Sequence, residues 1–204
     1  MITRSILALA IAYILGAIPF GLIFVRAKTG QDIRRLGSGR TGGTNVLRAA
    51  GPWIALPSIL CDMAKGWGAV RITQLLTGMP AIWAAAGLLA AVGHNYSIFI
   101  GFRGGAGTMT TVGGALGLWP LSCAIVVIAG GMAILLTRYA SAGSIVVALI
   151  LPLIFAWKAG SGGIPWSYLI HSIGTSALTL YALRPNIRRL LEGSERKVTL
   201  GRRS

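Results

Sequence analysis

The chain has 204 residues, of which 54% are hydrophobic and 11% charged, and its 19 lysines and arginines outnumber four acidic residues to give a formal net charge of +15. So few polar residues cannot cover the surface of a soluble globule, which excludes an ordinary soluble protein and indicates an integral membrane protein. The basic residues gather in two segments, 26–48 and 184–203, so we expect them beside the inner face of a membrane and expect no nucleic-acid partner.

Seven apolar segments predict an all-α integral membrane protein with about seven transmembrane helices. They are residues 5–25, 53–76, 80–100, 108–118, 120–137, 144–157 and 164–183. The fourth has 11 residues, and at a rise of about 1.5 Å per residue it cannot cross a hydrocarbon core of about 30 Å. A half-helix at this position and a five-span arrangement, in which it fuses with its neighbours, are both compatible with the sequence.

An odd number of spans places the two termini on opposite sides of the membrane. The basic C-terminal segment assigns that end to the cytoplasm, so the N-terminus is expected outside. The first apolar segment is interpreted as a retained helix, because no small-residue cleavage site precedes the first basic segment. We therefore expect one transmembrane domain over residues 1–187, with motif loops facing the cytoplasm, and a basic cytoplasmic tail over residues 188–204.

The first unusual segment is "RLGSGRTGGTNVLRAAG", residues 35–51. Closely spaced glycines let backbone N–H groups turn toward one point, and a following helix adds its positive end. Together they form an anion-binding site. The neighbouring hydroxyl, amide and guanidinium groups suit phosphate oxygens. The residues concerned are Ser38, Gly39, Arg40, Thr41, Thr44, Asn45 and Arg48. No Lys-Ser or Lys-Thr pair closes the turn, so it is not a nucleotide-binding P-loop.

In "CDMAKGWGAV" the spacing of three places Asp62 and Lys65 on one face of the second predicted span. Ionisable groups at membrane depth are candidates for function, although an ion pair that only joins helices is an equally good interpretation. Cys61 and Cys123 have neither paired spacing nor a partner histidine. They predict no disulfide and no metal site.

The second glycine-rich segment is "GHNYSIFIGFRGGAGTMTTVGG", residues 93–114. His94, near its start, could donate to a phosphate or accept a proton. Its candidate phosphate-binding residues are Arg103, Gly104, Gly105, Gly107 and Thr108. Tight helix packing is the alternative explanation for each glycine loop taken alone. A third segment, "RYASAGS" with Ser141, is expected on the same face of the membrane.

Five segments in order resemble the bacterial acyl-phosphate:glycerol-3-phosphate acyltransferases of the PlsY type. They are "GSGRTGGTNVLRAAG", "DMAKG", "GHNYSIFIGFRGGAGTMTTVGG", "RYASAGSI" and "NIRRLLEGSERK". The resemblance implies a multi-pass enzyme of the bacterial inner membrane. It would move a fatty acyl group from acyl phosphate to the hydroxyl of glycerol 3-phosphate, giving lysophosphatidate for phospholipid biosynthesis. It implies no metal and no cofactor, contact with membrane lipids, and a soluble partner enzyme that forms acyl phosphate.

The resemblance also implies roles for individual residues. Catalytic roles fall on Ser38, Asn45, Arg48 and His94. From the resemblance, substrate binding falls on Thr44, Gly104, Gly105, Gly107, Ser141 and Asn186. From their own chemistry and position, Gly39, Arg40, Thr41, Asp62, Lys65, Arg103 and Thr108 are added as candidates for substrate binding. We expect direct attack of the acceptor hydroxyl on the acyl carbonyl, because neither cysteine is near a motif and no serine lies in a nucleophile elbow.

The chain departs from the family pattern near the expected acceptor site. Ala106 replaces a usual Lys, Leu183 a usual His, and Arg40 a usual Asn. Our hypothesis is that Arg40 and Arg184 restore the missing positive charge. The departures keep other functions open: an acyltransferase with a changed acceptor, a relative without catalytic activity, and, on the strength of the glycine-rich helix ends, a small anion transporter.

Overall fold

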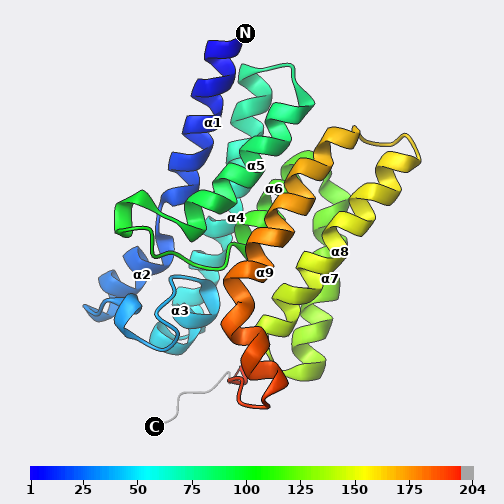
Figure 1. The fold of residues 1–204 in the computed structure, drawn as a ribbon. Helices are drawn as coiled ribbons and strands as arrows, with labels where there is room; N and C mark the ends of the chain where they lie inside the picture. Colours follow the sequence, from blue (N-terminus) through cyan, green and yellow to red (C-terminus); the bar gives the residue numbers. More distant parts are fainter. Residues whose placement is uncertain (199–204) are drawn as a thin grey trace.

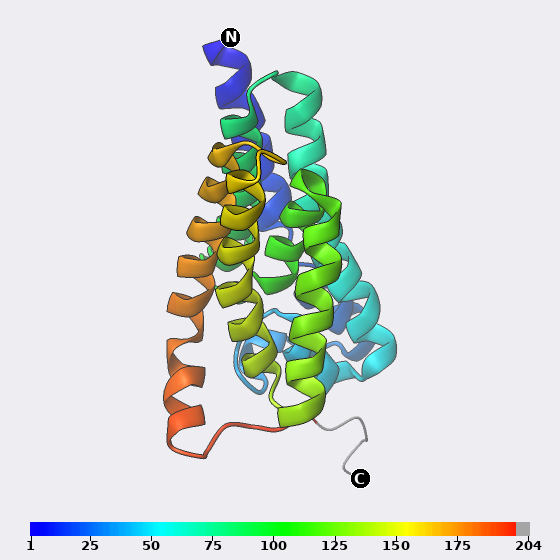
Figure 2. The ribbon, with the colours of Figure 1, turned by 90° about the vertical axis from the view of Figure 1, so that its right-hand side faces the viewer.

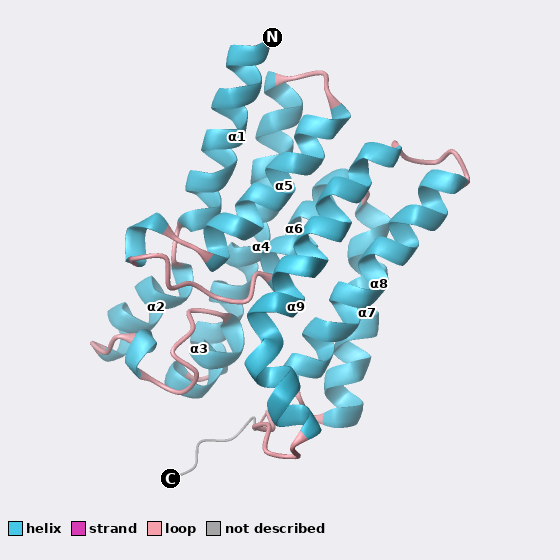
Figure 3. Ribbon diagram, viewed as in Figure 1, coloured by secondary structure: helices cyan, strands magenta, loops and turns pink. Residues whose placement is uncertain are grey.

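The computed structural model describes residues 1–198, which form helices and connecting loops without a β-strand (Figures 1 and 3). The all-helical class predicted from the sequence is confirmed for this part of the chain, and Arg202 and Arg203 of the predicted tail lie outside it. The helices are α1 (Ile2–Ala17), α2 (Phe20–Thr29), α3 (Gly43–Ala50), α4 (Pro52–Leu76), α5 (Pro80–Asn95), α6 (Thr108–Leu118), α7 (Pro120–Thr137), α8 (Ala140–Gly160) and α9 (Leu169–Leu191). Short 3₁₀ turns lie at Ile33–Arg35, Ile98–Ile100 and Trp166–Tyr168.

Four helical segments are long and apolar enough to cross a membrane: Ile2–Thr29, Pro80–Ile100, Pro120–Thr137 and Ala140–Gly160. Two further helices, α4 with 25 residues and α9 with 23, have sufficient length but a more polar sequence. Helix α6 has 11 residues and packs inside the bundle against α4, α5, α7 and α9, as Figure 2 shows from the side. This arrangement is that of a multi-pass helical membrane protein.

The first apolar segment, for which the sequence predicts a single helix, forms two helices instead. It breaks at Ile18–Pro19, because proline lacks an N–H group and disfavours a helical conformation in the residue before it. Two carbonyl groups at the break find side-chain donors: Ile18 O accepts from Lys65 Nζ at 2.9 Å, and Ala17 O accepts from Ser97 Oγ at 2.5 Å. Helix α2 therefore leaves the line of α1 and packs against α3 and α4 (Figure 1).

Helices α4 and α6 cross in close contact through glycines. A Cβ atom on Gly66 would collide with the carbonyl oxygen of Thr110, and one on Gly113 would collide with that of Met63. Small residues at such crossings let two backbones approach, which strengthens van der Waals packing between helices in a membrane. The close crossing holds the short helix α6 at a fixed depth in the bundle, and therefore fixes the position of its N-terminus.

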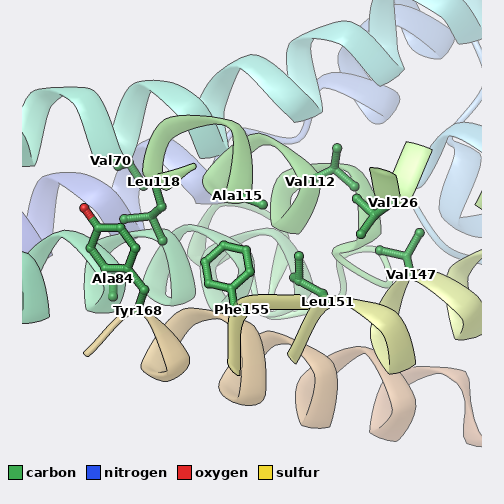
Figure 4. Close-up of a cluster of buried hydrophobic side chains, with 10 residues drawn as sticks. All are labelled: Val70, Ala84, Val112, Ala115, Leu118, Val126, Val147, Leu151, Phe155 and Tyr168. Atoms are coloured by element: carbon green, nitrogen blue, oxygen red, sulfur yellow. The ribbon is translucent and has the colours of Figure 1, made fainter. Parts of the chain in front are cut away.

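The largest apolar core joins α6 to α8 and extends to α4, α5 and α7 (Figure 4). Phe155 is fully buried, and its ring meets the ring of Trp119 edge to face at a centroid distance of 5.7 Å. Three core residues, Val112, Val126 and Val147, also line a cavity beside the core. The packing that stabilises the bundle therefore also forms one apolar wall of that cavity.

Candidate active site

A cavity of about 360 Å³ lies between the N-termini of α3 and α6, with α7, α8 and α9 on its other sides. It brings together predicted residues from five separate parts of the chain. These are Ser38, Arg40, Thr44, Asn45, Arg48, Asp62, His94, Gly107, Thr108, Ser141 and Asn186. The positions of two departures from the family pattern, Ala106 and Leu183, line the same cavity.

Two helix N-termini open onto this cavity. Gly42 precedes α3, and Gly107, with φ of 80° in the left-handed region, precedes α6. Neither helix has a side-chain hydrogen bond at its N-cap. The N–H of Asn45 donates to the carbonyl oxygen of Gly42 at 2.9 Å, which leaves the N–H groups of Gly43 and Thr44 in α3, and those of the first turn of α6, for another acceptor. Together with the positive ends of the helix dipoles they form a site that favours anions. The sequence analysis expected a helix after each glycine loop, and α3 and α6 have this arrangement.

Asn45 organises the loop before α3. Its Nδ2 donates to the carbonyl oxygens of Ile33, Leu36 and Arg40 at 3.3, 3.0 and 2.8 Å, and its Oδ1 accepts from the backbone N–H of Ser38 at 3.2 Å. The side chain is 3% exposed. Because its amide is occupied by the backbone, Asn45 sets the positions of Ser38 and Arg40 rather than offering a free group to a substrate.

Arg40 reaches across the cavity to α9. Its Nη1 donates to Asn186 Oδ1 at 3.2 Å, and its Nη2 donates to the carbonyl oxygen of Ala182. Burial and the nearby cation of Arg189 lower the pKa of Arg40, while the carboxylate of Glu195 partly offsets them. A desolvated cation of this kind gains strongly from an anionic ligand.

Glu195, from the segment after α9, extends into the cavity. Its Oε1 accepts from Ser141 Oγ at 3.1 Å and from Asn186 Nδ2 at 2.8 Å, and its Oε2 accepts from Arg189 Nε at 2.8 Å. Burial alone would raise the pKa of Glu195, but the hydrogen bonds from Asn186 and Arg189 outweigh it and hold that pKa below its usual value. The carboxylate therefore joins α8, α9 and the tail through charge-assisted hydrogen bonds.

The same tail segment crosses the end of the bundle through two backbone contacts. The carbonyl oxygen of Arg196 accepts from Arg48 Nη2 at 3.3 Å, and the N–H of Val198 donates to the carbonyl oxygen of Arg138 at 2.7 Å. Burial, followed by the neighbouring cation of Arg196, lowers the pKa of Arg48. The tail thus links α3 to the end of α7 beside the cavity.

Asp62 and Lys65 form the ion pair that the spacing indicated. Asp62 Oδ1 lies 2.8 Å from Lys65 Nζ and 3.4 Å from His94 Nδ1, and each of the three residues is at most 7% exposed. Lys65 Nζ also donates to Ile18 O at the break between α1 and α2. Asp62 and His94 line the cavity whereas Lys65 does not. Lys65 therefore affects the site through Asp62.

The second glycine loop is divided between two cavities. Gly39, Arg103, Gly104 and Gly105 line a separate cavity of about 400 Å³, which shares Arg40 with the first. The N–H of Gly104 donates to Asn95 O at 3.0 Å and that of Gly105 to His94 O at 3.1 Å, so both groups close the end of α5. These two N–H groups are therefore already occupied, whereas Gly107 and Thr108 line the first cavity, and phosphate binding by this loop stays a prediction. Thr41 lines neither cavity and packs under α2 against Gly21.

Sequence reasoning missed Glu195 and the apolar wall of the cavity. Glu195 is one of two carboxylates within an otherwise basic tail, and that exception in charge was the available signal. The wall comes from α7 and α8, and the signal there was the pair Gly130–Gly131 inside an apolar span. Its main residues are Val126, Val127, Gly130, Gly131, Ile134 and Val147.

Comparison with known proteins identifies the family of this chain. A family model described as glycerol-3-phosphate acyltransferase matches residues 6–193. A glycerol-3-phosphate acyltransferase of Syntrophomonas wolfei is 44% identical over 191 residues, covering 94% of this chain and 95% of the relative. Glycerol-3-phosphate acyltransferase 2 of Moorella thermoacetica is 41% identical over 199 residues, covering 98% and 99%.

Among solved structures, the glycerol 3-phosphate form of PlsY (YgiH), an integral membrane glycerol 3-phosphate acyltransferase, has a TM-score of 0.87 and 32% identity, with 96% of each chain covered. The lysophosphatidic acid form of that protein has a TM-score of 0.84. Sequence and architecture thus agree over nearly the whole chain. This protein belongs to the glycerol-3-phosphate acyltransferase family.

Proposed function

We propose that this membrane enzyme transfers a fatty acyl group from acyl phosphate to the hydroxyl of glycerol 3-phosphate, releasing lysophosphatidate and inorganic phosphate. One observation carries the proposal: the cavity has a polar wall with two helix N-termini and two arginines, and an apolar wall from α7 and α8. Acyl phosphate has the same two parts, a phosphate and a hydrocarbon chain. The names of the relatives support the acceptor, and the shape of the cavity supports the donor.

The proposed donor lies across the cavity with its phosphate near Ser38, Gly107 and Thr108. Its chain runs along Gly131 and Val127 of α7. Val127 is 46% exposed and also lines the cavity, so the apolar wall continues to the outer surface of α7. Such a continuous apolar surface lets the chain enter from the bilayer while the phosphate stays at the helix ends.

In the proposed reaction the acceptor hydroxyl attacks the acyl carbonyl carbon, a new ester C–O bond forms, and the anhydride C–O bond breaks. The phosphate leaves with the bonding electron pair. The protein contributes by holding two anions side by side and by stabilising the developing charge with donors already in place. The cysteines Cys61 and Cys123 do not line the cavity, which supports direct transfer without an acyl-enzyme.

We assign the hydroxyl proton to His94, which lines the cavity and lies with Nδ1 beside Asp62. A histidine that acts as a general base is usually oriented by a neighbouring carboxylate. His94→Asn should lower kcat by about 100-fold or more and leave KM for the donor nearly unchanged. An unchanged kcat in that variant would refute the proton-transfer role.

The proposed acceptor site lies at Arg40, Arg48, Ser141 and Asn186, with Glu195 orienting Ser141 and Asn186. The contact of Arg40 with α9 next to Leu183 supports the hypothesis that Arg40 replaces positive charge missing at positions 106 and 183. Arg184 lines the second cavity and not the first, so its position gives less support to the idea that it also replaces the missing charge.

For the membrane arrangement, we propose seven membrane segments in a bacterial inner membrane, with the N-terminus outside and the C-terminus in the cytoplasm. These are the four apolar segments, the two longer but more polar helices α4 and α9, and α6, which would be a half-helix enclosed by the others. The division into a domain over 1–187 and a tail over 188–204 remains a prediction, and α9 runs across that boundary. A soluble enzyme that forms acyl phosphate is the proposed partner.

The function is tested by incubating the purified protein in lipid nanodiscs with palmitoyl phosphate or palmitoyl-CoA and a series of polyol phosphates. Products are identified by mass spectrometry. We expect lysophosphatidate only from palmitoyl phosphate with glycerol 3-phosphate. Transfer from palmitoyl-CoA alone would overturn the donor assignment. Transfer to a different polyol phosphate would instead show that Ala106 and Leu183 mark a changed acceptor.

A further inference from the structure

The second cavity has no role in the proposed reaction. It lies on the opposite side of the second glycine loop, between the end of α5, the segment 96–105 and the middle of α9. Arg40 is the residue that it shares with the first cavity. Its lining consists of Gly39, Arg40, Asn95, Tyr96, Phe102, Arg103, Gly104, Gly105, Tyr181, Ala182, Arg184 and Pro185.

Three arginines, Arg40, Arg103 and Arg184, line this cavity, and its lining has no acidic residue. All four carboxylates of the chain pair elsewhere within residues 1–198: Asp32 with Arg34, Asp62 with Lys65 and His94, Glu192 with Arg188, and Glu195 with Arg189. Besides burial, the cation of Arg184 is among the causes that lower the pKa of Arg40, and the carboxylate of Glu195 offsets them only in part. A ligand with two negative charges would relieve the repulsion between these cations.

A buried amide lies between the two cavities. Asn95 is 5% exposed, and neither Nδ2 nor Oδ1 has a hydrogen-bond partner among the described residues. A buried polar group left without a partner is costly, and such groups are rare in folded proteins unless a ligand or water completes them. Asn95 lines the second cavity, while its Oδ1 lies against Gly107, which lines the first, so this amide stands between the two cavities.

Aromatic residues surround the arginines at the surface. Tyr96, Phe102 and Tyr181 are 39%, 58% and 57% exposed, and the guanidinium of Arg184 lies 4.2 Å from the centre of the Tyr181 ring. Exposed aromatic rings beside arginines are typical of the headgroup region of a membrane. The cavity is thus suited to a ligand whose phosphate lies among the arginines and whose remainder contacts lipid or aromatic surface.

We propose that the second cavity is a binding site for a phosphate monoester, distinct from the catalytic cavity. The forked donors of Arg103 and Arg184 hold the outer oxygens, and Arg40 contacts the phosphate from the side facing the first cavity. A monoester fits better than a diester because it carries close to two negative charges and three free oxygens. Two sources share this chemistry: the headgroup of phosphatidate or lysophosphatidate, and free glycerol 3-phosphate.

Two binding measurements on the purified full-length protein distinguish the sources. Native mass spectrometry compares retention of phosphatidate, phosphatidylglycerol and phosphatidylcholine at equal concentration. Equilibrium dialysis counts bound radiolabelled glycerol 3-phosphate. Both use the wild type, R103A/R184A, and the control R26A/R35A, which removes the same charge from two exposed arginines outside either cavity. Thermal unfolding checks that each variant is folded.

If the source is a lipid, R103A/R184A retains phosphatidate about tenfold less than the wild type and the control, because it loses charge-assisted hydrogen bonds. If the ligand is free glycerol 3-phosphate, the number of molecules bound falls from about two per chain to about one in R103A/R184A, and stays at about two in the control. Equal binding by all three proteins in both measurements overturns the proposal, and so does an equal loss in the control. Neither measurement needs an acyl donor. The count of about two per chain includes the proposed acceptor site; if that site did not exist, the wild type and the control would bind about one and R103A/R184A about none, so the two failures are distinguishable.

Discussion

Nη1 of Arg40 donates a hydrogen bond to Oδ1 of Asn186 at 3.2 Å, across a sequence separation of 146 residues. This contact joins the first glycine loop to α9 and places one guanidinium at the boundary between the two cavities. It supports the proposal that Arg40 supplies positive charge that Ala106 and Leu183 do not.

Arg40→Ala should raise KM for glycerol 3-phosphate by at least about tenfold, because one charge-assisted hydrogen bond to a phosphate is worth about 1.5–3 kcal/mol. Arg40→Lys should restore part of the affinity but not the forked geometry. Steady-state kinetics at saturating donor measure the effect, with Arg35→Ala as the control for loss of an exposed cation. Equal KM values for the wild type and Arg40→Ala would exclude an acceptor-binding role.

Glu195→Gln should weaken the link between α8, α9 and the tail, because a neutral amide attracts Arg189 less than a carboxylate does. The pKa of Glu195 lies below its usual value of 4.5. Its stabilising effect is therefore present above about pH 4.5 and is lost as the pH falls through the lower, folded-state pKa. Thermal unfolding at several pH values should show an acid-side loss of stability in the wild type that is smaller in Glu195→Gln. Identical pH profiles would show that this carboxylate contributes nothing to the fold.

Lys65→Met should destabilise the protein by about 3–5 kcal/mol, because it leaves the carboxylate of Asp62 buried without its cation. The double variant D62L/K65M removes both charges and should recover much of that stability. Thermal unfolding in one detergent measures both variants. If D62L/K65M were no more stable than Lys65→Met, the unpaired carboxylate of Asp62 would not be the cause of the lost stability.

Gly131→Leu tests the apolar wall. Gly131 lines the cavity, and a Cβ atom added there meets no other atom, so we expect the leucine side chain to extend into the space of the proposed acyl chain. We expect kcat/KM for palmitoyl phosphate to fall by about tenfold or more, with KM for glycerol 3-phosphate unchanged. Gly160→Leu is the matched control, since Gly160 also has open space but lies at the far end of α8. Equal effects of the two substitutions would argue against an acyl-binding wall there.

Much of the fold was predictable from local chemistry. Apolar segments marked the long helices, and Pro52, Pro80 and Pro120 mark the first residues of α4, α5 and α7, because the missing N–H of proline has no partner in a first turn anyway. The break at Pro19 also has a local cause, although the sequence analysis treated residues 5–25 as one helix. Each glycine loop precedes a helix N-terminus that lines the first cavity.

The sequence by itself thus determined the membrane class, the helix pattern and the types of donor available. Only the tertiary structure decided which donors are free. Gly104 and Gly105 resembled a phosphate cradle, but carbonyl groups of α5 already accept their N–H groups. Glu195 looked like part of a basic tail, but it reaches Ser141 over a separation of 54 residues. A hydrogen-bond donor can serve a substrate only if no nearer acceptor occupies it, and that depends on which distant segments the packing of the helices brings together.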